Sequence, residues 1–203
     1  MILFMSKLMS GILETLIVSF IPFITWLIWS RKKTGFFDWI GLKPVQIQQR
    51  GRLVLTIFGF IVLSLLSSIV FFSWFYSSKT ATVDFSGKGI GALPAILAFA
   101  FLGTALPEEI FFRGFLLKRL QGKLGFLGAN LVQSLLFGLL HALMFIQLMG
   151  YLRAMAIFAF TSLVAFVLGA INEQQANGSI LPSIFIHAFL NTVAGLCLAM
   201  SLL

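Results

Sequence analysis

Long apolar runs separated by short polar segments are the dominant pattern of this chain. A helix that crosses the roughly 30 Å hydrocarbon core of a bilayer needs about 20 apolar residues. Six stretches meet that length: 8–29, 53–76, 90–117, 125–146, 151–171 and 180–202. The pattern predicts an all-α, polytopic membrane bundle of about six transmembrane helices, in a single integral membrane domain over residues 1–203.

Pro107 lies inside the third apolar run. A proline removes one helical hydrogen bond and crowds the preceding turn. Residues 108–120 are therefore a candidate for a separate, tilted half-helix.

The composition supports a membrane protein and places its loops. Of the 203 residues 60% are hydrophobic and only 10% charged, against about 25% charged in soluble domains. The net charge of +8 comes from Lys and Arg clustered between apolar runs, at 31–52 and 118–123, which is how topology signals are distributed. Both basic loops are expected in the cytoplasm and both termini outside, and no nucleic-acid partner is expected.

Ionisable residues within the apolar runs carry most of the chemical information. Each costs about 2.5 to 3.5 kcal/mol on insertion scales, so those that remain are usually functional or paired. Glu108, Glu109 and Arg113 lie within or beside the third run, and the only two histidines, His141 and His187, lie in the fourth and sixth.

Helical spacing divides these residues into pairs. Glu109 and Arg113 are four apart and can form an ion pair, which leaves Glu108, about 100° around the helix, to face a polar cavity. The alternative makes all three a water-facing cluster at the membrane boundary. Phe137 and His141 share one helix face, as do His187 and Asn191, although a lone His or Asn often only links helices.

Glu108, His141, His187 and Asn191 lie on three separate helices. Together they contain a base, a proton carrier and neutral donors able to hold an oxyanion, which are the functional groups of a hydrolase. Serine and paired-aspartate mechanisms lack their residues. The chain has no Gly-x-Ser-Gly site, and its two aspartates, Asp38 and Asp84, fall in predicted loops.

Three short motifs carry a family resemblance: Glu-Glu-x-x-x-Arg at 108–113, Phe-x-x-x-His at 137–141 and His-x-x-x-Asn at 187–191. Their order and placement resemble those of the CAAX-protease and bacteriocin-processing (CPBP, or Abi) family of intramembrane endopeptidases, which includes the type II CAAX prenyl endopeptidases. The resemblance covers about residues 90–200 and implies a catalytic core at 90–202, preceded by two helices and loops at 1–89.

The resemblance also implies how the last four helices work. They would form a conical cavity in which Glu108 and His141 activate water while His187 and Asn191 stabilise the oxyanion, with Glu109, Arg113 and Phe137 in support. A zinc ion held by Glu108, His141 and His187 is the alternative. A metal-free mechanism is favoured because the chain lacks a His-Glu-x-x-His pair of ligands.

The leading functional hypothesis is an endopeptidase in the cell membrane that cuts a peptide or membrane-protein substrate. A second hypothesis is a bacteriocin self-immunity or regulatory protein that acts by binding a partner, such as a bacteriocin or signalling peptide. A third, a proton-coupled transporter, lacks an inverted repeat. The family's eukaryotic members have additional spans, so a prenylated CAAX substrate is not carried over.

Overall fold

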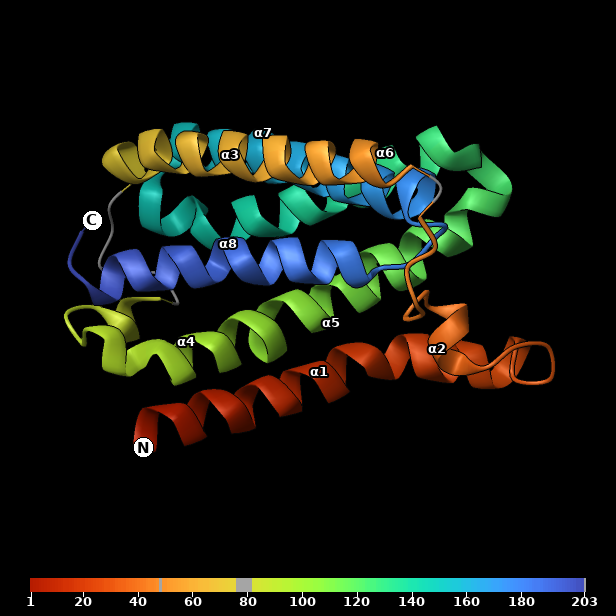
Figure 1. Ribbon diagram of the computed structural model, residues 1–203, viewed down its shortest axis with the longest axis horizontal. Coiled ribbons are helices and arrows are strands. Elements are labelled where there is room, and N and C mark those ends of the chain that lie inside the picture. Colours follow the sequence, from red (N-terminus) through yellow and green to blue (C-terminus); the bar gives the residue numbers. More distant parts are fainter. Residues whose placement is uncertain (48, 76–81, 203) are drawn as a thin grey trace.

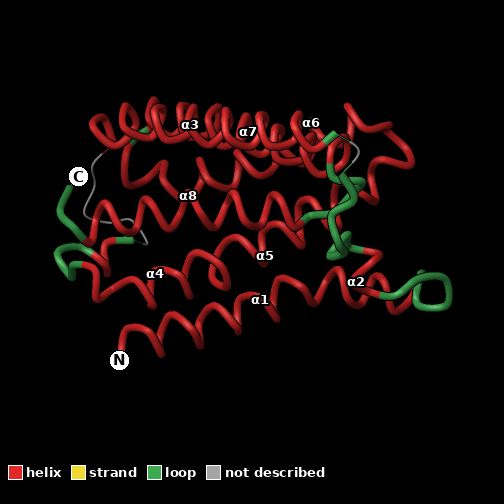
Figure 2. The backbone as a smooth tube through the Cα atoms, in the orientation of Figure 1, coloured by secondary structure: helices red, strands yellow, loops and turns green. Residues whose placement is uncertain are grey.

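The computed structural model describes residues 1–47, 49–75 and 82–202. Within these ranges every regular element is helical, as predicted (Figure 2). The elements are α1 (Ile2–Trp29), α2 (Phe36–Trp39), α3 (Arg50–Phe75), η1 (Val83–Phe85), η2 (Ile90–Ala92), α4 (Leu93–Ala98), η3 (Phe99–Ala105), α5 (Leu106–Glu109), η4 (Ile110–Leu117), α6 (Lys118–Met149), α7 (Tyr151–Ala170), η5 (Ile171–Gln175) and α8 (Leu181–Ala199). Residue 76, the last of the second apolar run, lies outside the described residues.

Five of these helical segments are long and apolar enough to cross a membrane. One of them, Ile90–Met149, has 60 residues and would be about 90 Å long if straight, which is far more than one crossing needs. Gly125 divides it, because its φ of 66° and ψ of 173° reverse the chain direction between two helical parts. The described residues therefore hold five candidate membrane-spanning segments, one of them bent at Gly125, as in a multi-pass integral membrane protein.

The predicted break at Pro107 is wrong. The helix continues through Pro107, and backbone angles remain helical from Ala105 to Ile110. Two π-helical segments, η3 and η4, flank the short α5. The wider turn of η3 just before Pro107 supplies the room that a proline needs in a helix, so the backbone is not interrupted.

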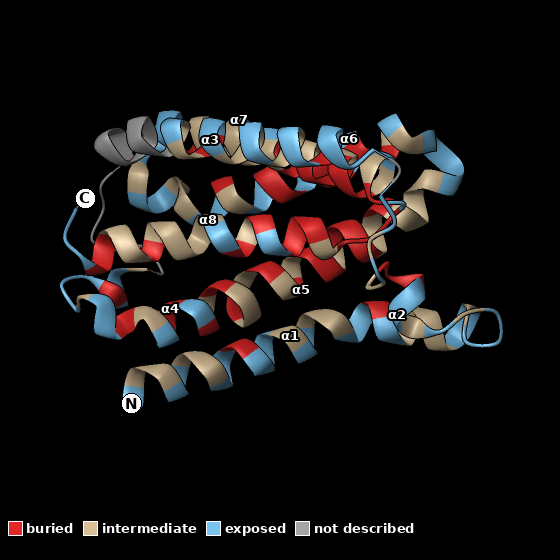
Figure 3. Ribbon diagram, viewed as in Figure 1, coloured by how far each residue is buried: buried red, intermediate tan, exposed pale blue. Residues whose placement is uncertain are grey.

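The helices form a bundle with α8 near its middle. In Figure 1, α4 and α5 lie between α1 and α8, and α3 lies on the opposite side of α8. Both termini lie at one end, and α2 and the turn around Gly125 lie at the other, as the distribution of basic loops predicts. Buried residues concentrate on α5, α8 and the inner face of α6, whereas α1 is largely exposed (Figure 3).

Close helix contacts fix the walls of the bundle. A Cβ on Gly138 would lie 2.0 Å from Ser162 Oγ, so α6 and α7 approach each other directly beside Phe137. Buried amides join the same two helices, because Asn130 donates to Phe166 O at 2.9 Å and Gln133 donates to Ala165 O at 3.2 Å. Small residues and interhelical hydrogen bonds are the usual means of packing helices in lipid.

The first helix packs on the helix that carries the glutamates. Thr15 Oγ1 donates to Leu102 O at 2.8 Å, and a Cβ on Gly11 would lie 2.9 Å from Gly103 N. At the outer end, Lys7 Nζ pairs with Asp84 at 2.7 Å and ties α1 to η1. Residues 1–89 thus contribute a helix that contacts η3 directly.

Candidate active site

The two glutamates lie on α5, at the centre of the long helix and between the π-helical turns. Glu109 is completely buried, whereas the Glu108 side chain is 26% exposed. Neighbours on a helix project about 100° apart, so one carboxylate reaches the protein interior while the other remains accessible. π-Helical turns are frequent at functional sites because they change the direction of successive side chains.

Glu109 and Arg113 form the predicted ion pair. Their atoms Oε1 and NH1 are 3.1 Å apart, and both side chains are fully buried. The guanidinium carbon of Arg113 also lies 4.6 Å from the centre of the Phe137 ring, close enough for a cation–π contact. The alternative of a water-facing cluster at the membrane boundary is therefore wrong for Glu109 and Arg113.

His187 connects α8 to both glutamates. Its Nδ1 lies 3.0 Å from Glu109 Oε1, and its Nε2 lies 3.8 Å from Glu108 Oε2. An ionised carboxylate can only accept hydrogen bonds, so Nδ1 carries a proton and Nε2 is directed to the exposed glutamate. Helical spacing predicted Arg113, four residues away, as the partner of Glu109. It did not predict the second partner, His187, which is 78 positions away.

Phe137 lies between the two imidazoles. Its ring centre is 4.3 Å from that of His141 and 6.3 Å from that of His187. His141 Nδ1 lies 2.9 Å from Phe137 O, and since a carbonyl only accepts, Nδ1 is the donor and Nε2 keeps a free lone pair. His141 therefore joins the cluster through Phe137, with Nε2 able to accept a proton.

Asn191 lies one turn beyond His187 on α8 and is held by Thr104. Its Nδ2 donates to Thr104 Oγ1 at 2.8 Å, and Thr104 in turn donates to Ala100 O at 2.9 Å. Thr104 was not predicted from the sequence, because a threonine in an apolar run has no distinctive signal. Its position one turn before Glu108 on the same helix is the only clue that the sequence offers.

The structure brings the predicted residues together to different degrees. Glu108, Glu109, Arg113 and His187 are linked by contacts within 4 Å, and Phe137 packs on this group. In the part of the chain that the structure describes, no three His, Cys, Asp or Glu side chains are grouped so that they could hold a metal ion. The alternative zinc site of Glu108, His141 and His187 does not fit this arrangement.

The arrangement suits acid–base chemistry on a neutral substrate. It combines an accessible carboxylate, an imidazole with a free nitrogen, a second imidazole fixed by a buried carboxylate, and an amide fixed by a hydroxyl. These groups come from three separate parts of the membrane bundle, on α5, α6 and α8.

Comparisons with known proteins identify the family of this chain. The model of the Rce1-like family, type II CAAX prenyl endopeptidase Rce1-like, matches residues 90–193, which is just over half of the chain and includes all three motifs. No curated protein and no solved structure matches the chain. The chain therefore belongs to the Rce1-like family of type II CAAX prenyl endopeptidases and is a multi-pass intramembrane endopeptidase.

Proposed function

We propose that the protein hydrolyses a peptide bond of a peptide or membrane-protein substrate with a water molecule activated by Glu108 and His141. The observation that carries this proposal is the bridge formed by His187, which reaches Glu109 at 3.0 Å and Glu108 at 3.8 Å across two helices. This bridge brings ionisable groups together inside a membrane bundle. Such groups cost free energy to place in the membrane, and those that occur there usually have a function.

In this mechanism Glu108 accepts a proton from the attacking water. Its partial exposure leaves room for water, unlike the fully buried Glu109. His141 donates from Nδ1 to Phe137 O, so its Nε2 is free to accept a proton. Nε2 can take the proton of the attacking water or pass a proton to the leaving amine. General acid–base action of this kind is worth roughly 10² to 10⁴ in rate.

His187 and Asn191 stabilise the oxyanion that forms on the scissile carbonyl. Glu109 accepts the hydrogen bond from His187 Nδ1, which leaves Nε2 to face the substrate. A proton taken up at Nε2 makes His187 an imidazolium that donates from Nε2 to the oxyanion. Thr104 accepts one amide hydrogen of Asn191, and the second hydrogen of that NH₂ group remains for the substrate. One such donor typically contributes about 10² to 10³ in rate.

The mechanism uses no metal ion, because the described carboxylates and imidazoles are not grouped as a ligand set. Zinc content of the purified protein, measured by elemental analysis, tests this part. Stoichiometric zinc that is required for cleavage would contradict it.

The experiment that tests the function compares cells that carry the wild-type protein with cells that carry Glu108→Gln. A membrane peptide or protein should accumulate uncut in the variant, and purified wild-type protein in liposomes should cleave it. Glu108→Gln should reduce that cleavage by at least about 10²-fold. A partner-binding immunity or regulatory protein would instead keep its cellular effect in a folded Glu108→Gln variant, which would contradict the proposal.

A further inference from the structure

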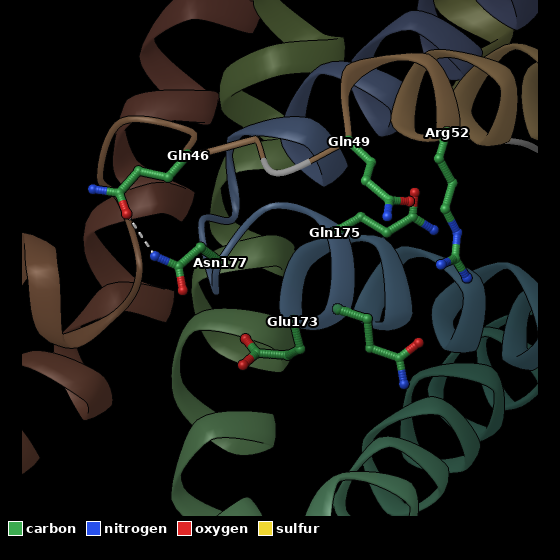
Figure 4. Close-up of a pocket in the computed structure, with 7 residues that line it drawn as sticks. Gln46, Gln49, Arg52, Glu173, Gln175 and Asn177 are labelled. Carbon is green, nitrogen blue, oxygen red and sulfur yellow. Dashed lines mark hydrogen bonds between the residues drawn. The ribbon is translucent and has the colours of Figure 1, made fainter.

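A polar pocket opens at the end of the bundle where α3 begins. It has a volume of about 160 Å³ and lies between the start of α3 and the segment that joins η5 to α8 (Figure 4). Its lining residues are Gln46, Gln49, Arg52, Glu173, Gln174, Gln175 and Asn177. None of these residues belongs to the active site, and we call the space that they line the polar pocket.

The polar pocket offers several hydrogen-bond donors around one cation. Figure 4 shows the ends of Gln49, Gln175 and Arg52 gathered on one side of the pocket. Within the described residues, the Arg52 guanidinium has no hydrogen bond or ion pair to another side chain. A planar guanidinium with free donors is suited to a phosphate or carboxylate.

The one acidic side chain of the pocket is already neutralised. Glu173 Oε1 pairs with Lys118 Nζ at 2.5 Å, and Lys118 also donates to Gly178 O at 2.8 Å. Lys43 and Arg119 lie close enough to repel the Lys118 charge, so further cations surround this pair. The charge that remains for a ligand is positive.

The pocket borders the polar end of a candidate membrane span. The apolar span of α3 begins at Arg50, which puts Arg52 in the first turn of that span, at its polar end. Basic side chains at this position are typical of the membrane interface. The phosphates of the adjacent leaflet are therefore at the same level as Arg52.

An apolar groove adjoins the polar pocket on the side of the hydrocarbon core. Its volume is about 630 Å³, and its lining residues come from α3, α4, η3, α8 and the stretch before α3, at Val45 and Ile47. Val45 and Ile47 line the groove while Gln46, between them, lines the polar pocket. Leu53 and Ile57 continue the groove along α3, next to Arg52 in the chain.

We propose that the polar pocket binds the phosphate of an anionic phospholipid and that the apolar groove holds one of its acyl chains. Arg52 takes the phosphate charge, and the amides of Gln49 and Gln175 donate to its oxygens. A zwitterionic headgroup carries a positive charge beside its phosphate. No unpaired acidic side chain among the residues that line the pocket can bind that positive charge. The two compartments, one polar and one apolar, match the two parts of a phospholipid.

Native mass spectrometry of the detergent-solubilised full chain tests the proposal. The protein is titrated with phosphatidylglycerol, with phosphatidylcholine and with phosphatidylglycerol in the presence of inorganic phosphate. Phosphatidylglycerol should bind more tightly than phosphatidylcholine, and Arg52→Gln should weaken its binding about fivefold, the effect of one interfacial cation. Inorganic phosphate should not displace it.

Arg50→Gln is the matched control, because Arg50 lies two residues away on the same helix and does not line the pocket. It should change phosphatidylglycerol binding less than Arg52→Gln does. Circular dichroism verifies that each variant folds. If Arg52→Gln does not fold, Gln175→Met replaces it, and this variant should also weaken phosphatidylglycerol binding. Equal losses in the two arginine variants, equal binding of the two lipids, or displacement by inorganic phosphate would overturn the proposal.

Discussion

At the residue scale, two adjacent glutamates have different environments and therefore different expected roles. Glu109 is buried between Arg113 and His187, whereas Glu108 is partly exposed and makes a longer contact with His187. Replacement by glutamine should therefore lower stability at Glu109 and lower catalytic activity at Glu108.

Glu109→Gln should lower the free energy of unfolding by about 3 to 5 kcal/mol, because it leaves the fully buried Arg113 charge without its partner. Unfolding by denaturant in detergent, followed by circular dichroism, measures the change. Glu108→Gln is the matched control and should leave the unfolding free energy nearly unchanged. Equal unfolding free energies for the two variants would contradict the structural role given to Glu109.

Thr104 should act on catalysis through Asn191. Thr104→Val removes the hydroxyl that accepts from Asn191 Nδ2 but keeps the shape of the side chain. We expect a lower kcat with little change in KM, smaller than the loss of about 10² to 10³ expected for Asn191→Ala, which removes an oxyanion donor. Thr104→Ser, which keeps the hydroxyl, should restore most of the rate, and a Ser variant as slow as the Val variant would exclude a positioning role.

Contacts between residues one turn apart on a helix could be predicted from the sequence, whereas contacts between separate helices could not. The Glu109–Arg113 pair follows from a spacing of four on one helix, and the same rule placed His141 near Phe137. The contacts of Glu109 with His187 and of Asn191 with Thr104 join α8 to a helix 78 and 87 positions earlier. No periodicity along the chain contains that information.

At the element scale, the conformation of one glycine decides how many times the chain crosses the membrane. Gly125 separates two apolar helices within one continuous helical run, and its backbone lies in a region that is essentially restricted to glycine. The apolar pattern began a new run at 125, where the structure bends, but the basic loop expected at 118–123 is wrong, because these residues are helical. It failed at Pro107, where π-helical turns accommodate the proline without a break.

Gly125→Ala should destabilise the protein by about 1 to 3 kcal/mol through backbone strain, since nothing lies within 4 Å of the added Cβ. Thermal unfolding of the purified protein measures the effect. Gly122→Ala is the control, because Gly122 has the same empty surroundings without a positive φ, and alanine there should be neutral or slightly stabilising. Equal unfolding temperatures for the two variants would show that the bend carries no strain.

At the scale of the whole molecule, the bundle explains how a polar site persists in lipid. Large apolar side chains make up much of the exposed surface of α1 and of the described part of α3, and the charged residues of α5 and η4 pack against α1, α6 and α8. The polytopic helical bundle, the common side of the termini and the family were predictable from the sequence. The cytoplasmic orientation, the conical cavity and the 90–202 core stay predictions.

The central claim is that side chains on α5, α6 and α8 act as one catalytic unit, and a double substitution tests it most directly. Cleavage of the accumulated substrate in liposomes is compared for Glu108→Gln, His141→Ala and the variant with both changes. Groups that act on the same water are strongly non-additive, so the double variant should be about as slow as the slower single variant. If the two losses multiply instead, Glu108 and His141 act independently and the proposed site is contradicted.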